Sequence, residues 1–158
     1  FLKHNMVPPS DYMTVDTLKQ SRANFYLPTH SLDNLGKQLT NDRKMKHSGF
    51  DLWTGCMNGN EESWATMLEY CKQDVRLLEE VYLKILPYMK NHPNHGLYRT
   101  NLYDGTVCKN CGSNMLRSKG QRTTRAGRYR RYQCNNCGSN LQGTENLMPK
   151  ELRKSMTK

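Results

Sequence analysis

The strongest pattern in the chain is a helical repeat of apolar positions between residues 60 and 90. Side chains recur there at intervals of three or four residues, which indicates one buried stripe on an α-helix: Trp64, Met67, Cys71, Val75, Leu78, Tyr82 and Ile85. A second line with similar spacing lies beside the first and consists of Tyr70, Asp74, Leu77 and Val81. The pattern predicts a long helix that buries the first line. Because Leu77 and Val81 continue the buried flank, Asp74 is expected at the edge of the interior.

The rest of the first hundred residues gives weaker signals. Ser31 is typical of a helix start, and Leu32, Leu35 and Leu39 follow it at helical spacing. Only residues 13–18 alternate like a strand. Val and Ile together number six in 158 residues, whereas a buried sheet is normally rich in both. We therefore expect a mostly helical fold, or one whose sheet is formed by residues outside this sequence.

Charge is concentrated in the last third of the chain. The formal net charge is +10, with 12 basic and 11 acidic residues in positions 1–103 and 12 basic and three acidic residues in positions 104–158. This asymmetry favours contact of the second part with nucleic acid or anionic lipid. No apolar stretch approaches the roughly 20 residues that cross a membrane, and no secretory signal pattern opens the sequence. We expect an intracellular, cytoplasmic protein that does not span a membrane.

Composition divides the chain into four segments. We expect a first domain over residues 1–90, a linker over 91–106, a basic cysteine-bearing module over 107–145 and a basic tail over 146–158. The linker contains two histidines beside a proline, which we interpret as linker residues and not as metal ligands.

Two CysxxCys pairs are the most specific motif in the sequence. Cys108 and Cys111 form one pair, Cys134 and Cys137 form the other, and 22 residues lie between the pairs. Each pair is followed by Gly-Ser-Asn, a tight turn that brings backbone N–H groups toward the thiolates. Four thiolates suit tetrahedral Zn²⁺, and the long interval predicts a β-hairpin between two knuckles. Two disulfides or a redox dithiol are the alternatives. Disulfides fit an intracellular chain poorly, and a redox pair would not need to be doubled.

The interval between the knuckles carries seven basic residues and no acidic one. Arginine binds phosphate in a bidentate manner, and tyrosine stacks on unpaired bases. We predict nucleic-acid contact, with DNA preferred over RNA, by the residues Lys119, Arg122, Arg125, Arg128, Tyr129, Arg130, Arg131 and Tyr132. The alternative is a solvated hairpin that needs charge only for solubility.

Several single residues have two interpretations. Asp74 is costly on a partly buried helix face unless it pairs with a Lys or Arg or binds a metal ion. For Asp16 we favour a place on a strand face or at a helix cap over a role as metal ligand. Cys56 and Cys71 are expected to be buried thiols.

Tyr70 and Asp74 also match a family motif. The segment 70–75, TyrCysLysGlnAspVal, resembles the third motif, TyrxxxAsp, of the DnaQ-like 3'-5' exonucleases, the tyrosine branch of the DEDD group within the RNase H-like fold. The order and spacing of other stretches are similar to the later half of such domains in phage proteins and family B DNA polymerases: residues 15–18, 31–35, 49–53, 67–75 and 78–87. The resemblance covers about residues 1–90.

The resemblance implies a metal-dependent phosphodiester hydrolysis. In the family, four acidic side chains hold two divalent metal ions that activate a water molecule. The resemblance assigns Asp74 as a ligand of Mg²⁺ or Mn²⁺ and Tyr70 as the phenol that orients the attacking water. The two residues are one helical turn apart and therefore face the same way.

The two earlier acidic motifs of the family would precede Asp16 and do not occur in this sequence. We therefore expect an α/β fold comprising a partial RNase H-like domain, mostly helical in this stretch, followed by a small β zinc ribbon. This chain alone is expected to be inactive as a nuclease, and a phage-encoded protein of this kind would act in the host cytoplasm. The alternative is a non-catalytic zinc-ribbon DNA-binding protein whose helical part serves assembly.

Overall fold

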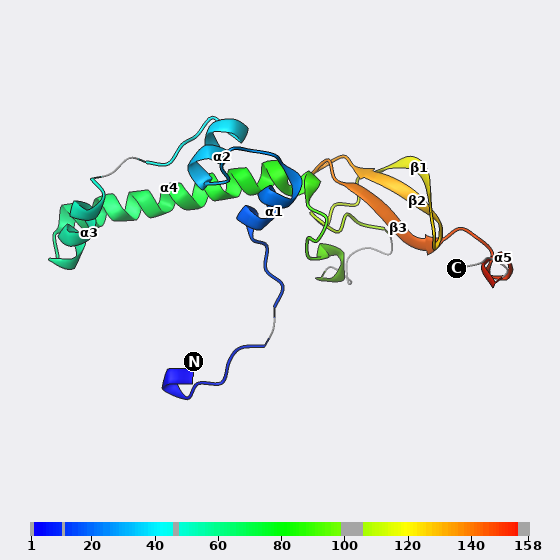
Figure 1. Cartoon of the computed structure of the whole chain (residues 1–158), viewed down its shortest axis with the longest axis horizontal. Helices are drawn as coiled ribbons and strands as arrows, with labels where there is room; N and C mark the ends of the chain where they lie inside the picture. The colour runs from blue at the N-terminus through cyan, green and yellow to red at the C-terminus, as the bar shows by residue number, and fades with distance from the viewer. Residues whose placement is uncertain (1, 11, 46–47, 99–105, 155–158) are drawn as a thin grey trace.

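The computed structural model describes residues 2–10, 12–45, 48–98 and 106–154. In chain order, their elements are η1 (Leu2–His4), α1 (Thr17–Asn24), α2 (Leu32–Leu39), α3 (Phe50–Met57), α4 (Glu61–Ile85), η2 (Leu86–Tyr88), η3 (His95–Tyr98), β1 (Leu116–Thr124), β2 (Gly127–Cys134), β3 (Asn140–Asn146) and α5 (Lys150–Lys154). Figure 1 shows an elongated molecule in which α1, α2 and α3 lie along α4, and the sheet lies beyond the C-terminal end of α4.

Helix α4 confirms the predicted long helix. Its N-cap is Asn60, whose side chain accepts a hydrogen bond from the Ser63 N–H at 2.9 Å. Glu61 and Glu62 occupy the first turn, where carboxylates interact favourably with the helix dipole. The helix ends at Ile85 and continues as the 3-10 turn η2.

The buried face of α4 is narrower than predicted. Leu77 and Val81 of the second line and Ile85 of the first are fully or almost fully buried, as expected. Val75 and Leu78 of the first line are 66% and 41% exposed. Helix α2 covers only the side of Leu77, and its Gly36 allows this close approach, because a Cβ atom there would lie 2.9 Å from Leu77 Cδ1. The apolar residues of α4 extend over a wider surface than its neighbours cover.

The short helices support one sequence prediction and correct another. Ser31 caps α2 as predicted, and its hydroxyl accepts a hydrogen bond from the Asn34 N–H at 3.3 Å. Residues 13–18 do not form a strand, because Asp16 caps α1 and accepts a hydrogen bond from the Lys19 N–H at 3.1 Å. The helix-cap interpretation of Asp16 is therefore correct.

The second part of the chain is a three-stranded antiparallel sheet in the order β1-β2-β3. Strands β1 and β2 form the predicted long hairpin, in register from the pair Leu116 and Cys134 to the pair Thr124 and Gly127, with a β-bulge after Ser118. The fold thus combines helices with a small sheet.

The sheet module is docked on the end of α4. Ile85, Leu86 and Met89 form a buried cluster, and Cys111 and Cys137 pack against it. The predicted linker over 91–106 lies partly outside the described residues, as do the last four residues of the predicted tail. Among the helices described, none is both long enough and apolar enough to traverse a bilayer.

Candidate metal centre and nucleic-acid interface

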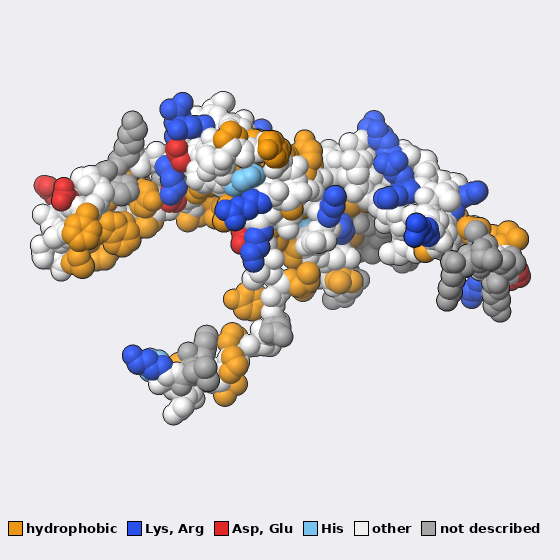
Figure 2. Space-filling model, viewed as in Figure 1, with side chains coloured by type: hydrophobic (Ala, Val, Ile, Leu, Met, Phe, Trp, Pro, Cys, Tyr) orange, Lys and Arg blue, Asp and Glu red, His pale blue; other side chains and the backbone are white. Residues whose placement is uncertain are grey.

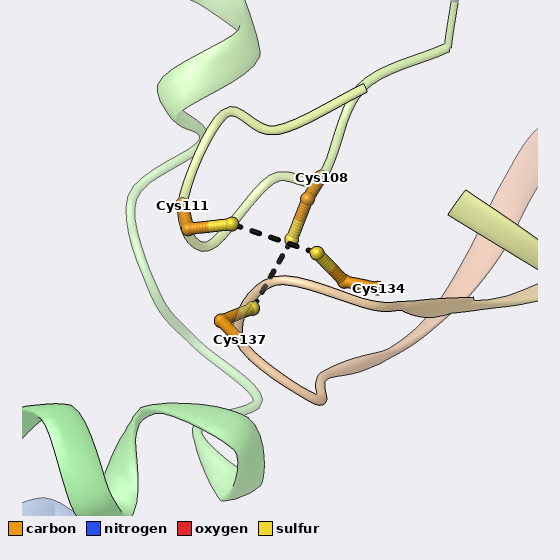
Figure 3. A group of neighbouring side chains, drawn as sticks. All are labelled: Cys108, Cys111, Cys134 and Cys137. Atoms are coloured by element: carbon orange, nitrogen blue, oxygen red, sulfur yellow. Dashed lines mark hydrogen bonds between the residues drawn. The ribbon is translucent and has the colours of Figure 1, made fainter. Parts of the chain in front are cut away.

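Four cysteine sulfurs converge between the two knuckles. Figure 3 shows the side chains of Cys108, Cys111, Cys134 and Cys137 pointing toward one another. Their Sγ atoms all lie within 4.8 Å of one another. Two of the sulfur pairs, Cys108 with Cys137 and Cys111 with Cys134, are 3.6 Å apart. Four sulfurs at about 2.3 Å from a central ion would be separated by about 3.8 Å along the edges of a tetrahedron. The donor set and its spacing therefore fit a tetrahedral metal ion such as zinc.

The repeated CysxxCysGlySerAsn sequence folds in the same way twice. The N–H groups of Gly112 and Gly138 donate to the carbonyls of Cys108 and Cys134 at 2.7 and 2.9 Å. Both glycines have positive φ, at 71° and 79°, a conformation that residues with a side chain rarely adopt. The two turns carry the paired thiols into one site.

The environment separates the thiols by acidity. Burial raises the pKa of Cys108 and of Cys137. Burial also acts to raise the pKa of Cys111, but hydrogen bonds from the Asn136 side chain and the Ser113 N–H outweigh it and lower the pKa to about 7. A metal ion must therefore displace protons from Cys108 and Cys137, whose raised pKa keeps them protonated near neutral pH.

The interior of the ribbon contains little that could replace a metal. Residues 107–145 are all described, and those classed as buried are Cys108, Asn110, Gly112, Gly127, Cys134 and Ser139. None of these is a large aliphatic or aromatic residue. A module without an apolar core of its own depends on a bound metal or on its neighbour for stability.

Asn110 joins the ribbon to the helical part, a role that the sequence analysis missed. Its side chain is 2% exposed, and its Nδ2 donates to the carbonyls of Leu86 and Met89 at 3.0 and 3.4 Å and to Ser139 Oγ at 3.0 Å. Both carbonyls lie just after the end of α4, and that of Leu86 also accepts a hydrogen bond from the Met89 N–H at 3.2 Å. Asn136 holds the same motif position in the second knuckle and is exposed, so no local signal distinguishes the two.

The sheet divides the predicted nucleic-acid residues between its two faces. Side chains alternate along β2, so Arg128, Arg130 and Tyr132 point to one face, and Tyr129 and Arg131 point to the other. Arg122 pairs with Tyr129 across the hairpin and shares its face. Lys119 lies in the bulge of β1, and Arg125 lies in the turn between β1 and β2. The two-residue period of any β-strand could have predicted this division, although the residue types in 127–134 do not alternate.

The basic residues of the ribbon have no acidic partner within the described structure. The ion pairs among the described residues are Lys37 with Asp33, Lys44 with Asp74, and Lys72 with Glu69, all in the helical part. Figure 2 shows Lys and Arg side chains gathered over the sheet on the face that it displays. Cations without counter-charge repel one another unless an anion is present.

Tyr70 and Asp74 lie together, with Lys44 between them. The Lys44 ammonium donates to Asp74 Oδ2 at 2.8 Å and to the Tyr70 hydroxyl at 3.1 Å. The hydrogen bond with Asp74 raises the pKa of Lys44. The side chains of Lys44 and Asp74 are 32% and 24% exposed, while Asp74 Oδ1 is buried without a hydrogen-bond partner among the described residues. The structure therefore gives Asp74 the cationic partner that the alternative interpretation expected.

The donor set around Asp74 does not fit Mg²⁺ or Mn²⁺ as it stands. In the described part of the chain, the only group of three or more His, Cys, Asp or Glu side chains whose ligand atoms meet is the cysteine cluster. Asp74 Oδ2 is also occupied by an ammonium group. The catalytic roles of Tyr70 and Asp74 remain predictions.

The remaining cysteines and the histidines differ from expectation in part. Cys56 is buried as predicted, but Cys71 is exposed, because it lies on the uncovered face of α4. His92 is only 6% exposed, donates through Nδ1 to the Pro93 carbonyl at 2.7 Å and accepts at Nε2 from the Tyr82 hydroxyl at 2.7 Å. The segment after η2 is thus tied to α4.

Comparisons with known proteins add no assignment. No family model matches the chain, and no curated protein and no solved structure matches it significantly.

Proposed function

We propose that this chain binds nucleic acid through a ribbon held together by zinc. The observation that carries the proposal is a set of ribbon Lys and Arg side chains that have no ion-pair partner among the described residues. They lie on a hairpin that a four-cysteine site anchors. Each phosphate that such a side chain neutralises adds to affinity by releasing a counter-ion. The near-neutral helical part supplies a rigid base for the ribbon.

The test is a titration of the zinc-loaded chain against labelled DNA at several salt concentrations. We expect log Kd to rise linearly with log salt, with a slope that indicates about four or more phosphate contacts. RNA of the same sequence is expected to bind less tightly. Absence of binding at low salt, or binding that does not respond to salt, would contradict the proposal.

For the helical part, we propose a contribution to a metal-dependent 3'-5' exonuclease site. Tyr70 and Asp74 support this proposal, because their polar atoms converge on one point, now filled by the Lys44 ammonium. The further carboxylates that such a site requires would have to come from outside the described residues. The proposal therefore expects no hydrolysis by this chain alone.

Two measurements test the exonuclease proposal. Metal-dependent degradation of DNA by the isolated chain would contradict it. In any longer polypeptide or assembly that contains this chain and degrades DNA, Asp74→Asn should abolish cleavage and preserve binding, whereas Asp33→Asn, at a half-exposed surface pair, should leave both unchanged.

The second candidate is a binding protein without catalysis, and the Lys44 contact favours it. A carboxylate that already has an ammonium partner needs no metal ion for its charge. If Asp74→Asn leaves cleavage by the larger assembly intact, the helical part serves binding and assembly only.

A further inference from the structure

A groove runs between the end of α4 and strand β3. Its volume is about 930 Å³, within the range of roughly 300–1,000 Å³ typical of small-ligand sites and large enough for a short run of nucleotides. The turn after α4 and the first knuckle form one wall, and β2 and β3 form the other. The residues on which the inference depends, called the β3 groove below, are Tyr88, Lys90, Lys109, Arg130, Tyr132 and Gln142.

The charge of the groove is positive. Lys90, Lys109 and Arg130 line it, and Glu145 is the one acidic residue among its described lining. Lys90 and Arg130 are exposed. The Lys109 ammonium uses one of its three hydrogens on the Lys90 carbonyl at 2.7 Å, which holds it at the wall and leaves two hydrogens for an anion. Phosphate groups are the complementary partner.

The groove also contains aromatic rings. Tyr132 lies beside Gly143, and a Cβ atom at Gly143 would be 3.5 Å from Tyr132 Cε2. Because glycine has no side chain, Gly143 does not cover the ring on the groove side. Tyr88 is 57% exposed, and Phe25 holds its ring from behind in an edge contact with centroids 5.1 Å apart. Rings that are supported on one side and open on the other can stack on bases.

We propose that the β3 groove binds an unpaired segment of nucleic acid. Bases would stack on Tyr132 and Tyr88, and phosphates would contact Lys90, Lys109 and Arg130. Bases within a duplex already stack on one another and cannot reach these rings, so a single strand is the expected ligand. This inference rests on the proposed nucleic-acid binding and deepens it, since it assigns binding to one face of the sheet and extends the site to residues of the helical part.

The sheet itself provides matched controls. Arg130 and Arg131 are neighbours of identical chemistry on opposite faces of β2, and Tyr132 and Tyr129 form a second such pair. Lys90 lines the groove, whereas Lys84 is exposed on α4 and is not part of its lining. Each pair permits the same substitution inside and outside the proposed site.

The experiment measures binding of the zinc-loaded full chain to a labelled oligothymidylate of about 20 nucleotides, long enough to exceed typical site sizes, and to a duplex of equal length. We expect the single strand to bind more tightly than the duplex. Tyr132→Leu should weaken binding at least about fivefold, the effect of losing one stacked base. Arg130→Gln and Lys90→Gln should weaken it about three- to tenfold and lower the salt slope by about one each. Tyr129→Leu and Arg131→Gln should each weaken it less than the matched groove variant, and Lys84→Gln, outside the ribbon and the groove, should change it less than about twofold.

The outcomes separate this inference from the proposed function. If the unmodified chain binds neither probe, both fail. If it binds but the outer-face variants lose as much affinity as the groove variants, or more, the groove inference is wrong and nucleic-acid binding stands. Tighter binding of the duplex would likewise overturn the inference. Zinc content and thermal melting equal to those of the unmodified chain are required of every variant, and Arg130→Gln, at an exposed position, keeps the test open if Tyr132→Leu is unstable.

Discussion

The helical part and the ribbon differ in what stabilises them. In the helical part, α4 buries Leu77 and Val81 against α2 but leaves Trp64 and Val75 more than half exposed. Figure 2 shows hydrophobic side chains gathered at the α3 end of the molecule. In the ribbon, the residues classed as buried are small or polar, and the four thiols are the only group that could hold a metal ion in the described chain. The helical part thus leaves much of its apolar surface exposed, whereas the ribbon has almost no apolar surface to bury.

The two parts are therefore stabilised by different interactions, according to how many apolar side chains each can bury. Hydrophobic burial contributes roughly 25 cal/mol per Å² of apolar surface, so a segment rich in Arg and polar residues gains little from it. Metal coordination by four thiolates is an alternative source of folding free energy. The two parts meet where Cys111 and Cys137 contact the cluster of Ile85, Leu86 and Met89.

Loss of the metal should produce the largest effect and should separate the two parts. Structural zinc sites contribute on the order of 10 kcal/mol to folding, so Cys108→Ser or a chelator is expected to unfold residues 107–145 while much of α4 remains helical. NMR amide spectra measure both regions, and elemental analysis should give one zinc per chain before the change.

Cys71→Ser is the matched control, because Cys71 is an exposed thiol outside the cluster. It should alter neither zinc content nor stability. If the amide signals of residues 107–145 stay dispersed after Cys108→Ser, the ribbon does not depend on the metal for folding. The proposed difference between the two parts would then be wrong.

The next largest effect distinguishes the two faces of α4. Leu77 is fully buried and Leu78 is 41% exposed, although they are adjacent and chemically identical. Leu77→Ala should lower the free energy of unfolding by about 2–5 kcal/mol, as for other buried leucines. Leu78→Ala should cost less than about 1 kcal/mol, since its side chain leaves no cavity. Denaturant unfolding followed by circular dichroism measures both, and equal losses would mean that the first line is buried after all.

A smaller effect is expected at the junction between the two parts. Asn110→Ala removes the hydrogen bonds to Leu86, Met89 and Ser139 in a buried site and should cost about 1–3 kcal/mol. Because these bonds cross the junction, the thermal transitions of the helical part and of the ribbon should move apart. Asn136→Ala, at the exposed equivalent position, removes one hydrogen bond to Cys111 Sγ and should lower the melting temperature less than Asn110→Ala does. A larger effect there than at Asn110 would contradict the junction.

The smallest effect concerns the pH dependence of metal binding. The pKa of Cys111 is lowered to about 7, so its thiol is already deprotonated above that pH and must lose a proton to the solvent below it. The apparent zinc affinity should fall as the pH is lowered. Below pH 7 it should fall by about one further factor of ten per pH unit, because Cys111 then has to release a proton as well. Competition titration with a chromophoric chelator between pH 6 and 8 measures this slope. An unchanged slope in the unmodified chain would contradict the proposed acidity of Cys111.

Much of the local structure could be predicted from the sequence. Helical spacing predicted α4, Ser31 predicted the start of α2, and the interval between the CysxxCys pairs predicted the hairpin. The strand-like alternation of residues 13–18 was misleading. Asp16 is a good N-cap, and this helix-start signal outweighs six residues of alternation. The four-residue spacing of Tyr70 and Asp74 on a helix predicted that they face the same way, and their shared contact with Lys44 shows that they do.

The sequence by itself determined the elements and the chemistry that residues can perform, because periodicity, caps and ligand spacing are local properties. Only the tertiary structure decided how much of the apolar surface of α4 is buried, since that depends on where α2 packs. It also decided that Asn110 joins the two parts while Asn136, in an identical motif position, is exposed and donates to Cys111 Sγ. The same holds for Arg130, which lines the β3 groove because α4 ends beside one face of the sheet and not the other.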